Sequence, residues 1–197
     1  MAEGALTAEL ILGTTEDVLR RYGPAKATVV DVARALGVSH GSVYRHFPTK
    51  AALREAVARR WLERWHEGLA DVAHTDAPAE QRLRDWLSTL FEIKRQKVRE
   101  DPELFDTFAT LMRENLAVVD DHVTGLESDL AKIIADGIES GDFAPRDSKV
   151  AARAVFDATN RFHDPIYAAD WKAPTIDVAF TAVVSLVVSG LSVPDHP

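Results

Sequence analysis

Apolar residues recur at spacings of three and four along most of this chain, and that period predicts α-helices. Val29, Val32, Ala33 and Leu36, for example, fall on one face of a predicted helix. No stretch alternates apolar and polar positions as a sustained amphipathic strand does. Proline and glycine interrupt the pattern and divide it into about nine segments. The predicted fold class is therefore all-α, with about nine helices.

The bounds of the predicted helices follow from their apolar faces and from the residues that end them. The first begins near Leu6 and ends at Gly23–Pro24, and Asp101 is expected to cap the helix that starts near Pro102. The others are predicted at about 29–36, 40–47, 52–65, 78–99, 103–117, 123–138, 146–162 and 175–191.

Residues 28–47 predict two short helices joined by a tight turn. Thr28 and Asp31 form a start that is similar to a capping box, and Gly37 stands where a left-handed C-cap is needed. Ser39 is expected to cap the second helix. A helix this short is not stable alone, so neighbouring helices must hold it in place. Two helices joined in this way form a helix-turn-helix, a motif that reads DNA.

The formal net charge of −8 at first argues against a nucleic-acid partner, because phosphate binding depends on Lys and Arg. The distribution of charge changes this conclusion. Residues 1–60 carry 9 Lys and Arg against 6 Asp and Glu, a balance of +3. Residues 61–197 carry 14 against 25, a balance of −11. The basic excess therefore lies with the predicted DNA reader.

The order and spacing of ten residues resemble the N-terminal signature of the tetracycline-repressor-like family of transcriptional regulators. These residues are Thr28, Asp31, Ala33, Gly37, Val38, Ser39, Gly41, Tyr44, Phe47 and Lys50. The resemblance covers about residues 5–55, and the remainder of the chain fits the family by length and helical pattern. It implies a three-helix DNA-binding head at residues 1–50 and a helical effector-binding and dimerisation domain at residues 51–197.

The resemblance also implies which residues contact DNA. Tyr44 and Lys50 are expected to bind phosphate, which positions the protein without reading sequence. The other reading is that Tyr44 packs on the helix surface and that Lys50 is simply solvated. Base contacts are expected from the second helix, and Thr28 and Ser39 join the DNA-binding set although capping already gives them a structural role. The residues expected at the bases are His40, Ser42, Arg45 and His46.

The middle of the chain is rich in aromatic and thioether side chains, which line small-molecule pockets as well as ordinary cores. Phe105, Phe108 and Met112 share a helical face and, with Trp86 and Phe162, are the residues we expect to contact a small effector of unknown identity. Ordinary core packing is the alternative for each. No cofactor is predicted.

The last predicted helix, residues 175–191, has few polar positions around its circumference. One buried face does not accommodate so many apolar residues, so we expect a second copy of the protein to cover the rest. A central position in a monomeric bundle is the alternative. The family resemblance implies a homodimer formed through the last two helices.

Two other kinds of site were weighed. Gly37 to Gly41 match the Gly-x-Ser-x-Gly pattern around a hydrolase nucleophile, but that elbow requires a preceding strand, so no catalytic residue is predicted. Four side chains have the chemistry of ligands for a divalent metal ion: Asp120, Asp121, His122 and His163. Nothing fixes their geometry, and Asp120 and Asp121 fit a helix junction equally well, so no metal site is predicted.

The sequence and the resemblance together predict a cytoplasmic, homodimeric transcriptional regulator that binds a double-stranded DNA operator and responds to a small molecule. In the manner of the family, the expected regulator is a repressor that the small molecule releases from DNA. The chain has no cysteine, its start does not resemble a signal peptide, and its apolar runs are shorter than the ~20 residues of a membrane span. The alternative is a small-molecule-binding helical protein that has lost DNA binding. Operator sequence, and whether the effector releases or recruits DNA binding, stay open.

Overall fold

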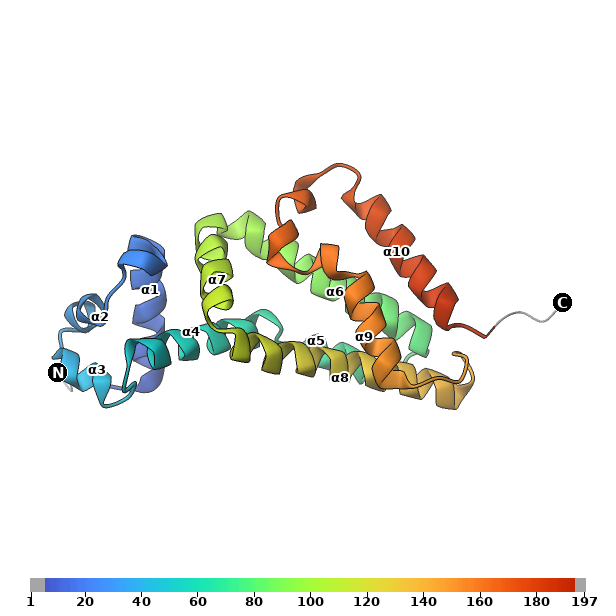
Figure 1. The fold of residues 1–197 in the computed structure, drawn as a ribbon, viewed down its shortest axis with the longest axis horizontal. Coiled ribbons are helices and arrows are strands. Elements are labelled where there is room, and N and C mark those ends of the chain that lie inside the picture. Colours follow the sequence, from blue (N-terminus) through green and yellow to red (C-terminus); the bar gives the residue numbers. More distant parts are fainter. Residues whose placement is uncertain (1–5, 194–197) are drawn as a thin grey trace. The chain divides into compact units, whose positions relative to one another are not determined.

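A computed structural model describes residues 6–193, and within this range the chain forms ten α-helices, three 3₁₀ turns and no strand (Figure 1). The α-helices are α1 Ala8–Lys26, α2 Val29–Leu36, α3 His40–Tyr44, α4 Lys50–Trp65, α5 Leu69–Ala73, α6 Ala79–Glu100, α7 Pro102–Glu114, α8 Leu116–Ser140, α9 Ser148–Ala158 and α10 Ile176–Leu191. The 3₁₀ turns are η1 Asn160–Phe162, η2 Pro165–Tyr167 and η3 Asp170–Lys172. The prediction of an all-α fold is confirmed. None of the described helices is both long and apolar enough to cross a bilayer.

The helices gather into two compact units. The first runs to residue 64 and takes in residues 101–119, so that α7 and the start of α8 pack with the N-terminal helices. The second comprises residues 65–100 and the chain from residue 120 onward.

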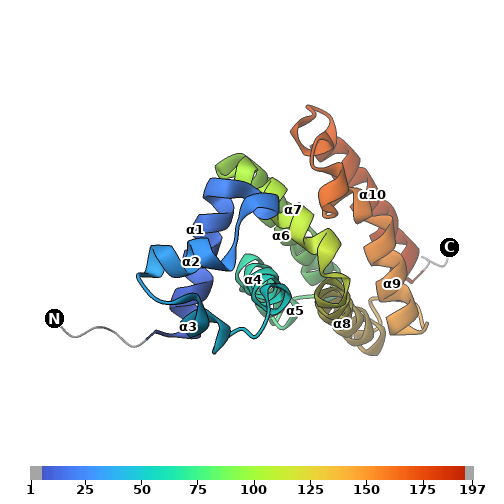
Figure 2. The same ribbon diagram turned by 60° about the vertical axis from the view of Figure 1, so that its left-hand side comes forward.

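In the first unit, α1 packs against α2 and α7, and α2 packs against α3 (Figure 2). Trp61 of α4 is fully buried, and its ring centroid lies 6.0 Å from that of Phe108 on α7. The carboxylate of Glu16, only 7% exposed, forms an ion pair with Arg60 Nε at 3.3 Å and accepts a hydrogen bond from Arg64 Nη1 at 3.3 Å. This packing supplies the neighbours that the short helices α2 and α3 require.

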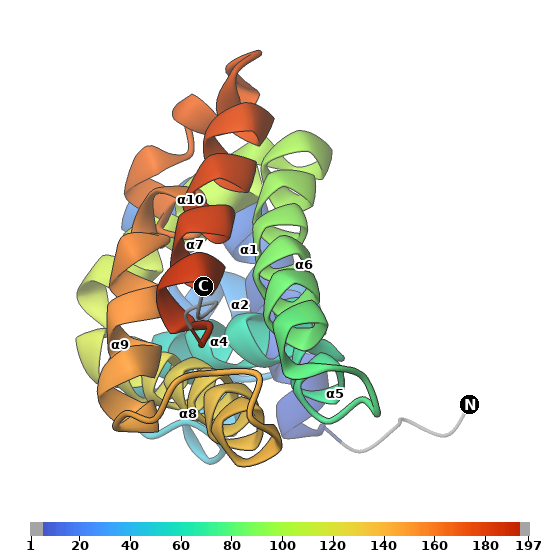
Figure 3. The same ribbon diagram turned by 90° about the vertical axis from the view of Figure 1, so that its right-hand side faces the viewer.

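In the second unit, α10 contacts both α6 and α9 and lies between them in the view of Figure 3. The core is apolar, and its fully buried side chains include Trp86 of α6, Leu130 of α8 and Phe143 after α8. Gly141, with φ of 84°, ends α8 in the left-handed region that favours glycine. The backbone then turns so that Phe143 pairs with Ser192 in an isolated β-bridge.

Several predicted helix ends are wrong. The helix predicted to stop at Gly23–Pro24 resumes for one turn, because proline is tolerated at a helix start and Gly23, at φ of 71°, supplies the break. The second helix of the pair ends at Tyr44 instead of residue 47. Helix α5 was not predicted at all, since five residues are too few to show a period.

The predicted junction at Asp120–Asp121 is also wrong. Helix α8 runs unbroken through both residues, and the break from α7 falls at Asn115, whose side-chain amide donates to the Leu111 carbonyl at 2.7 Å. The helix predicted from 146 to 162 ends at Ala158, and the chain continues as the three 3₁₀ turns. The second of these turns begins at Pro165, which has no N–H for a helical hydrogen bond.

Candidate DNA interface and ligand pocket

The start of α2 is a complete capping box. The Thr28 Oγ1 accepts from the Asp31 N–H at 3.2 Å, and the Asp31 carboxylate accepts from the Thr28 N–H at 3.1 Å and from its hydroxyl at 2.6 Å. The hydrogen bond from the Thr28 hydroxyl, with help from Arg34, lowers the pKa of Asp31. At the other end Gly37 adopts φ of 68° and receives the predicted left-handed cap. These local predictions are confirmed.

Helix α3 begins with a network of three polar side chains. Ser39 is the N-cap, and its Oγ accepts from the Ser42 N–H at 3.2 Å. The two serine hydroxyls lie 2.9 Å apart, and Arg45 Nη2 donates to the Ser42 hydroxyl at 3.1 Å. Of the predicted base-contacting residues, Ser42 and Arg45 are thus linked to each other and to the cap.

One residue anchors α3, and most of the others face outward. Val43 is fully buried, whereas Tyr44 is 39% exposed with its ring edge toward His40, at 6.3 Å between centroids. Phe47, expected inside, is only half-buried, because the helix has already ended at Tyr44. The side chains left exposed on and after α3 include five that are predicted to contact DNA: His40, Tyr44, Arg45, His46 and Lys50. Ser42, also predicted there, is half-buried.

The segment that contains α3 has an excess of positive charge. No Asp or Glu occurs between Asp31 and Glu55, a segment that contains four cations. Arg34 is paired with Asp31 at 3.0 Å and Arg54 with Glu114 at 2.7 Å, whereas Lys50 makes no ion pair among the described residues. A phosphate that approaches α3 therefore meets the exposed Arg45 and Lys50, neither of which pairs with a carboxylate among the described residues.

The hydrolase-like pattern lacks the context that such an elbow needs. Ser39 lies between two helices, and the described residues place no strand before it. Its hydroxyl is engaged in capping α3. The geometry gives this serine a structural role.

The five residues expected to contact a ligand are all buried, and they fall into both units. Phe105, Phe108 and Met112 lie on α7 in the first unit. Trp86 and Phe162 lie in the second, where Trp86 belongs to the apolar core. Their contact with a ligand stays a prediction.

Four aromatic rings cluster in the second unit around Phe91 of α6. Its ring centroid lies 5.5 Å from Phe162, 4.9 Å from Phe180 and 6.5 Å from Trp171. The guanidinium of Arg95 lies over the Phe91 ring at 5.0 Å from its centroid, a cation–π contact. Rings from α6, η1, η3 and α10 are thereby fixed together.

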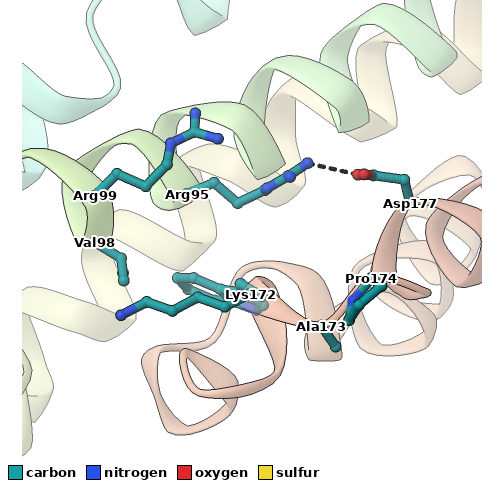
Figure 4. Close-up of a pocket in the computed structure, with 8 residues that line it drawn as sticks. Arg95, Val98, Arg99, Lys172, Ala173, Pro174 and Asp177 are labelled. Atoms are coloured by element: carbon teal, nitrogen blue, oxygen red, sulfur yellow. Dashed lines mark hydrogen bonds and ion pairs between the residues drawn. The ribbon is translucent and has the colours of Figure 1, made fainter.

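A pocket of about 330 Å³ opens beside this cluster, between the C-terminal part of α6 and residues 171–177 (Figure 4). Figure 4 shows Arg95 extending along it to Asp177, with Arg99 and Lys172 at one end and Pro174 toward the other. The lining combines three cations and one acid with apolar groups: Arg95, Val98, Arg99, Trp171, Lys172, Ala173, Pro174 and Asp177.

A separate group of basic side chains is buried in the same unit. Lys94 is 5% exposed and His163 is 6% exposed, and the half-buried His122 ring lies 4.3 Å from that of His66. Burial lowers the pKa of Lys94 to about 8, against the opposing effect of Asp164. Burial also lowers the pKa of both His122 and His163 to about 4, and the nearby charge of Lys94 acts in the same direction. These imidazoles are therefore neutral at neutral pH.

The side chains considered for a metal site are not brought together. Asp120 and Asp121 are exposed on α8, and His163 Nε2 lies 3.1 Å from the Phe156 carbonyl oxygen. Within the described part of the chain, no three His, Asp or Glu residues are grouped so as to hold a metal ion.

No sequence pattern predicted the pocket beside α6. Arg95 and Arg99 are four residues apart and so share a helix face, but Lys172 comes from the irregular segment after α9. No periodicity connects that segment with α6.

Comparison with known proteins places both halves of the chain in one family. Residues 11–57 match the family described as bacterial regulatory proteins, tetR family, and residues 79–184 match the tetracyclin repressor-like C-terminal domain. A helix-turn-helix transcriptional repressor of Mycobacterium tuberculosis, Rv1474c, is 36% identical over 57% of this chain and 62% of its own length. The transcriptional regulator RutR of Escherichia coli is 25% identical over 78% of this chain and 72% of its own. The match to Rv1474c thus spans less than two thirds of that relative.

Solved structures show the same fold. FadR of Bacillus subtilis, crystallised with stearoyl-CoA, has a TM-score of 0.69 at 19% identity, covering 94% of this chain and 100% of that one. SmeT, the repressor of a Stenotrophomonas maltophilia multidrug efflux pump, has a TM-score of 0.70 at 16% identity, covering 97% and 93%. The family matches cover more than half of the chain and include the helix-turn-helix described above. The chain belongs to the tetR family of bacterial regulatory proteins.

Proposed function

We propose that this protein is a homodimeric, ligand-responsive repressor that binds a pseudo-palindromic operator in double-stranded DNA. The observation that carries the proposal is α3: it is anchored by Val43, presents polar side chains outward and lies in a segment free of acids. Family membership and the printed name of the Mycobacterium relative, a transcriptional repressor, support it. A regulator of this kind meets its DNA in the bacterial cytoplasm.

The proposed contacts divide by chemistry. The Tyr44 hydroxyl and the Lys50 ammonium bind phosphate oxygens and set the position of α3 in the major groove. Arg45 donates to guanine, with its guanidinium already oriented by Ser42, and His40 and His46 contact neighbouring base edges. Thr28 and Ser39 cap the two helices and offer their exposed hydroxyls at the same surface.

Two heads require a dimer, and α9 with α10 supplies the proposed interface. The outward face of α10 exposes Val178 at 73% and Leu186 at 74%, eight residues apart on one stripe with Ala182 between them. Helix α9, in contact with α10, exposes Val150 at 67%. A second copy that covers these side chains removes an apolar surface from water.

The second unit is the proposed ligand-binding body. Among solved structures with this fold, FadR holds stearoyl-CoA and RolR holds resorcinol. We extend ligand binding to this chain, with Trp86 and Phe162 as the proposed apolar contacts in the second unit. Phe105, Phe108 and Met112 lie in the first unit, and their contact with a ligand stays a prediction. Helix α4 belongs to the first unit as far as Arg64, and the chain enters the second unit at Trp65. A ligand releases DNA only if it binds the two arrangements of the dimer with different affinity.

The proposal is tested by mobility shift against DNA from upstream of the protein's own gene. Lys50→Ala and Tyr44→Ala should weaken binding. Because a dimer presents two copies of Lys50, its loss should reduce the slope of log K against log salt by about 1.8. Arg113→Ala is the matched control, since it removes one exposed cation of the first unit from α7.

The mobility-shift experiment tests the assigned interface and the proposed function separately. Binding that is unchanged in both Tyr44 and Lys50 variants contradicts the assigned interface. A wild-type protein with no salt-dependent DNA affinity contradicts the function and leaves a helical ligand-binding protein instead.

A further inference from the structure

The pocket beside α6 is a cationic site within an acidic part of the chain. Residues 61–197 carry a net charge of −11, yet three of the eight lining residues are cations and one is an acid. Glu92, which lies outside the lining, contacts both Arg95 and Arg99. With Asp177 and Glu92 both counted, one positive charge is left over. An anion is therefore attracted to this place and repelled by most of the surrounding surface.

The three cations are held differently. Arg95 Nη1 pairs with Asp177 at 2.5 Å and with Glu92 at 2.8 Å, and its guanidinium covers the Phe91 ring, so it serves to join α6 to α10. Arg99 has a single, longer contact of 3.4 Å to Glu92, and more than half of its side chain is exposed. Lys172 is exposed and makes no ion pair among the described residues. Arg99 and Lys172 are thus the cations available to a ligand.

The rest of the pocket lining is mainly apolar. Trp171 is 2% exposed, and its Nε1–H donates to the Arg161 carbonyl at 2.8 Å, which fixes the indole. Ala173 and Pro174 continue this wall toward α10. A volume of about 330 Å³ lies at the lower end of the range for small-molecule sites.

We propose that this pocket binds a small organic anion, whose carboxylate or phosphate group is held by Arg99 and Lys172 and whose apolar body lies against Trp171 and Pro174. The proposal deepens the ligand response proposed above and rests on it, since it names the chemical class of ligand and a site on the second unit. Charge-assisted hydrogen bonds select the anion, and the indole wall selects a flat apolar group.

Binding is measured by NMR titration of the full-length ¹⁵N-labelled protein without DNA, with the Trp171 indole N–H as the reporter. Benzoate and phenyl phosphate are the anionic probes and separate a carboxylate from a phosphate preference. Benzyl alcohol is the uncharged analogue. The test variant combines Arg99→Gln with Lys172→Gln. The control combines Arg84→Gln with Lys149→Gln, which removes the same charge from half-buried Arg84 on α6 and exposed Lys149 on α9.

At least one anion should shift the Trp171 signal saturably, in the wild type and the control alike, and bind more tightly than benzyl alcohol. The test variant should bind it at least about tenfold more weakly, because both charge-assisted hydrogen bonds to the anion are lost. Equal binding by both variants, equal binding of benzyl alcohol, or no saturable shift overturns the inference. The titration contains no DNA, so its result is independent of the mobility-shift experiment. Anion binding without any retardation of DNA would contradict only the repressor function. Retardation of DNA without binding of either anion would contradict only this site.

Discussion

Acid should destabilise this protein through His163. The imidazole is 6% exposed, its ring centroid lies 4.2 Å from that of Phe156, and its Nε2 lies 3.1 Å from the Phe156 carbonyl oxygen. Burial lowers its pKa to about 4 and Lys94 assists, although the Phe156 carbonyl, Asp164 and Asp157 oppose the shift. The folded state therefore keeps the ring neutral, whereas the unfolded chain protonates it near 6.5.

The direction and the size of the effect of pH on the free energy of unfolding follow from this difference in pKa. Above about pH 6.5 the ring is neutral in both states, and its full contribution to stability is present. As the pH falls from 6.5 toward 4, the unfolded chain binds a proton that the folded protein does not, and stability is lost. Between pH 7 and pH 5 one such histidine should reduce the free energy of unfolding by about 2 kcal/mol.

Urea unfolding followed by circular dichroism at pH 7 and pH 5, at one fixed protein concentration, measures this loss. His163→Gln keeps an amide that can donate to the Phe156 carbonyl but cannot titrate, so its loss between the two pH values should be about 2 kcal/mol smaller than that of the wild type. His46→Gln, which replaces an exposed histidine, is the control and should behave like the wild type. A His163→Gln protein as acid-sensitive as the wild type, or ring NMR signals that titrate near pH 6.5, would refute the reasoning.

Two further predictions concern packing and assembly. A Cβ at Gly137 of α8 would lie 2.7 Å from Cε2 of Phe143 and 2.8 Å from Cβ of Ala79, so Gly137→Ala should lower the free energy of urea unfolding by about 1–3 kcal/mol. A Cβ at Gly125 on the same helix meets nothing within 4 Å, so Gly125→Ala should raise the free energy of unfolding by up to about 1 kcal/mol. A Gly137→Ala protein more stable than the Gly125→Ala protein would contradict the packing around Gly137. Leu186→Glu should shift the dimer toward monomer in sedimentation, whereas Gln81→Glu, exposed on α6, should not; a monomeric wild type would contradict the interface.

The helix-turn-helix could be predicted from sequence because its determinants are local. The Thr28–Asp31 box and the Gly37 cap each depend on residues within one turn, and both form as expected. The end of α3 at Tyr44 could not be predicted, because Phe47 continues the apolar spacing after the helix has stopped. Contact of α3 with DNA is a property of two molecules, so it remains a proposal.

The helices that follow the helix-turn-helix were less predictable, because the residues at which they begin and end depend on tertiary packing. Asp120 and Asp121 have the composition of a junction, yet α8 runs straight through them because buried residues continue on both sides, from Val118 to Leu126. The segment after Ala158 forms 3₁₀ turns that have no period to detect, and Trp171 and Lys172 of the pocket come from it.

Charge shows most clearly why composition alone misleads. A formal net charge of −8 argues against DNA and against anions in general, but a count does not distinguish a paired cation from an available one. Arg54 and Arg95 have carboxylate partners that cancel most of their field, whereas Lys50 and Lys172 make no ion pair among the residues that the structure describes. Only the second kind offers an incoming phosphate or carboxylate an uncompensated charge. The two proposed anion sites of this acidic protein therefore depend on where its cations are left unpaired, which only the folded arrangement of the chain decides.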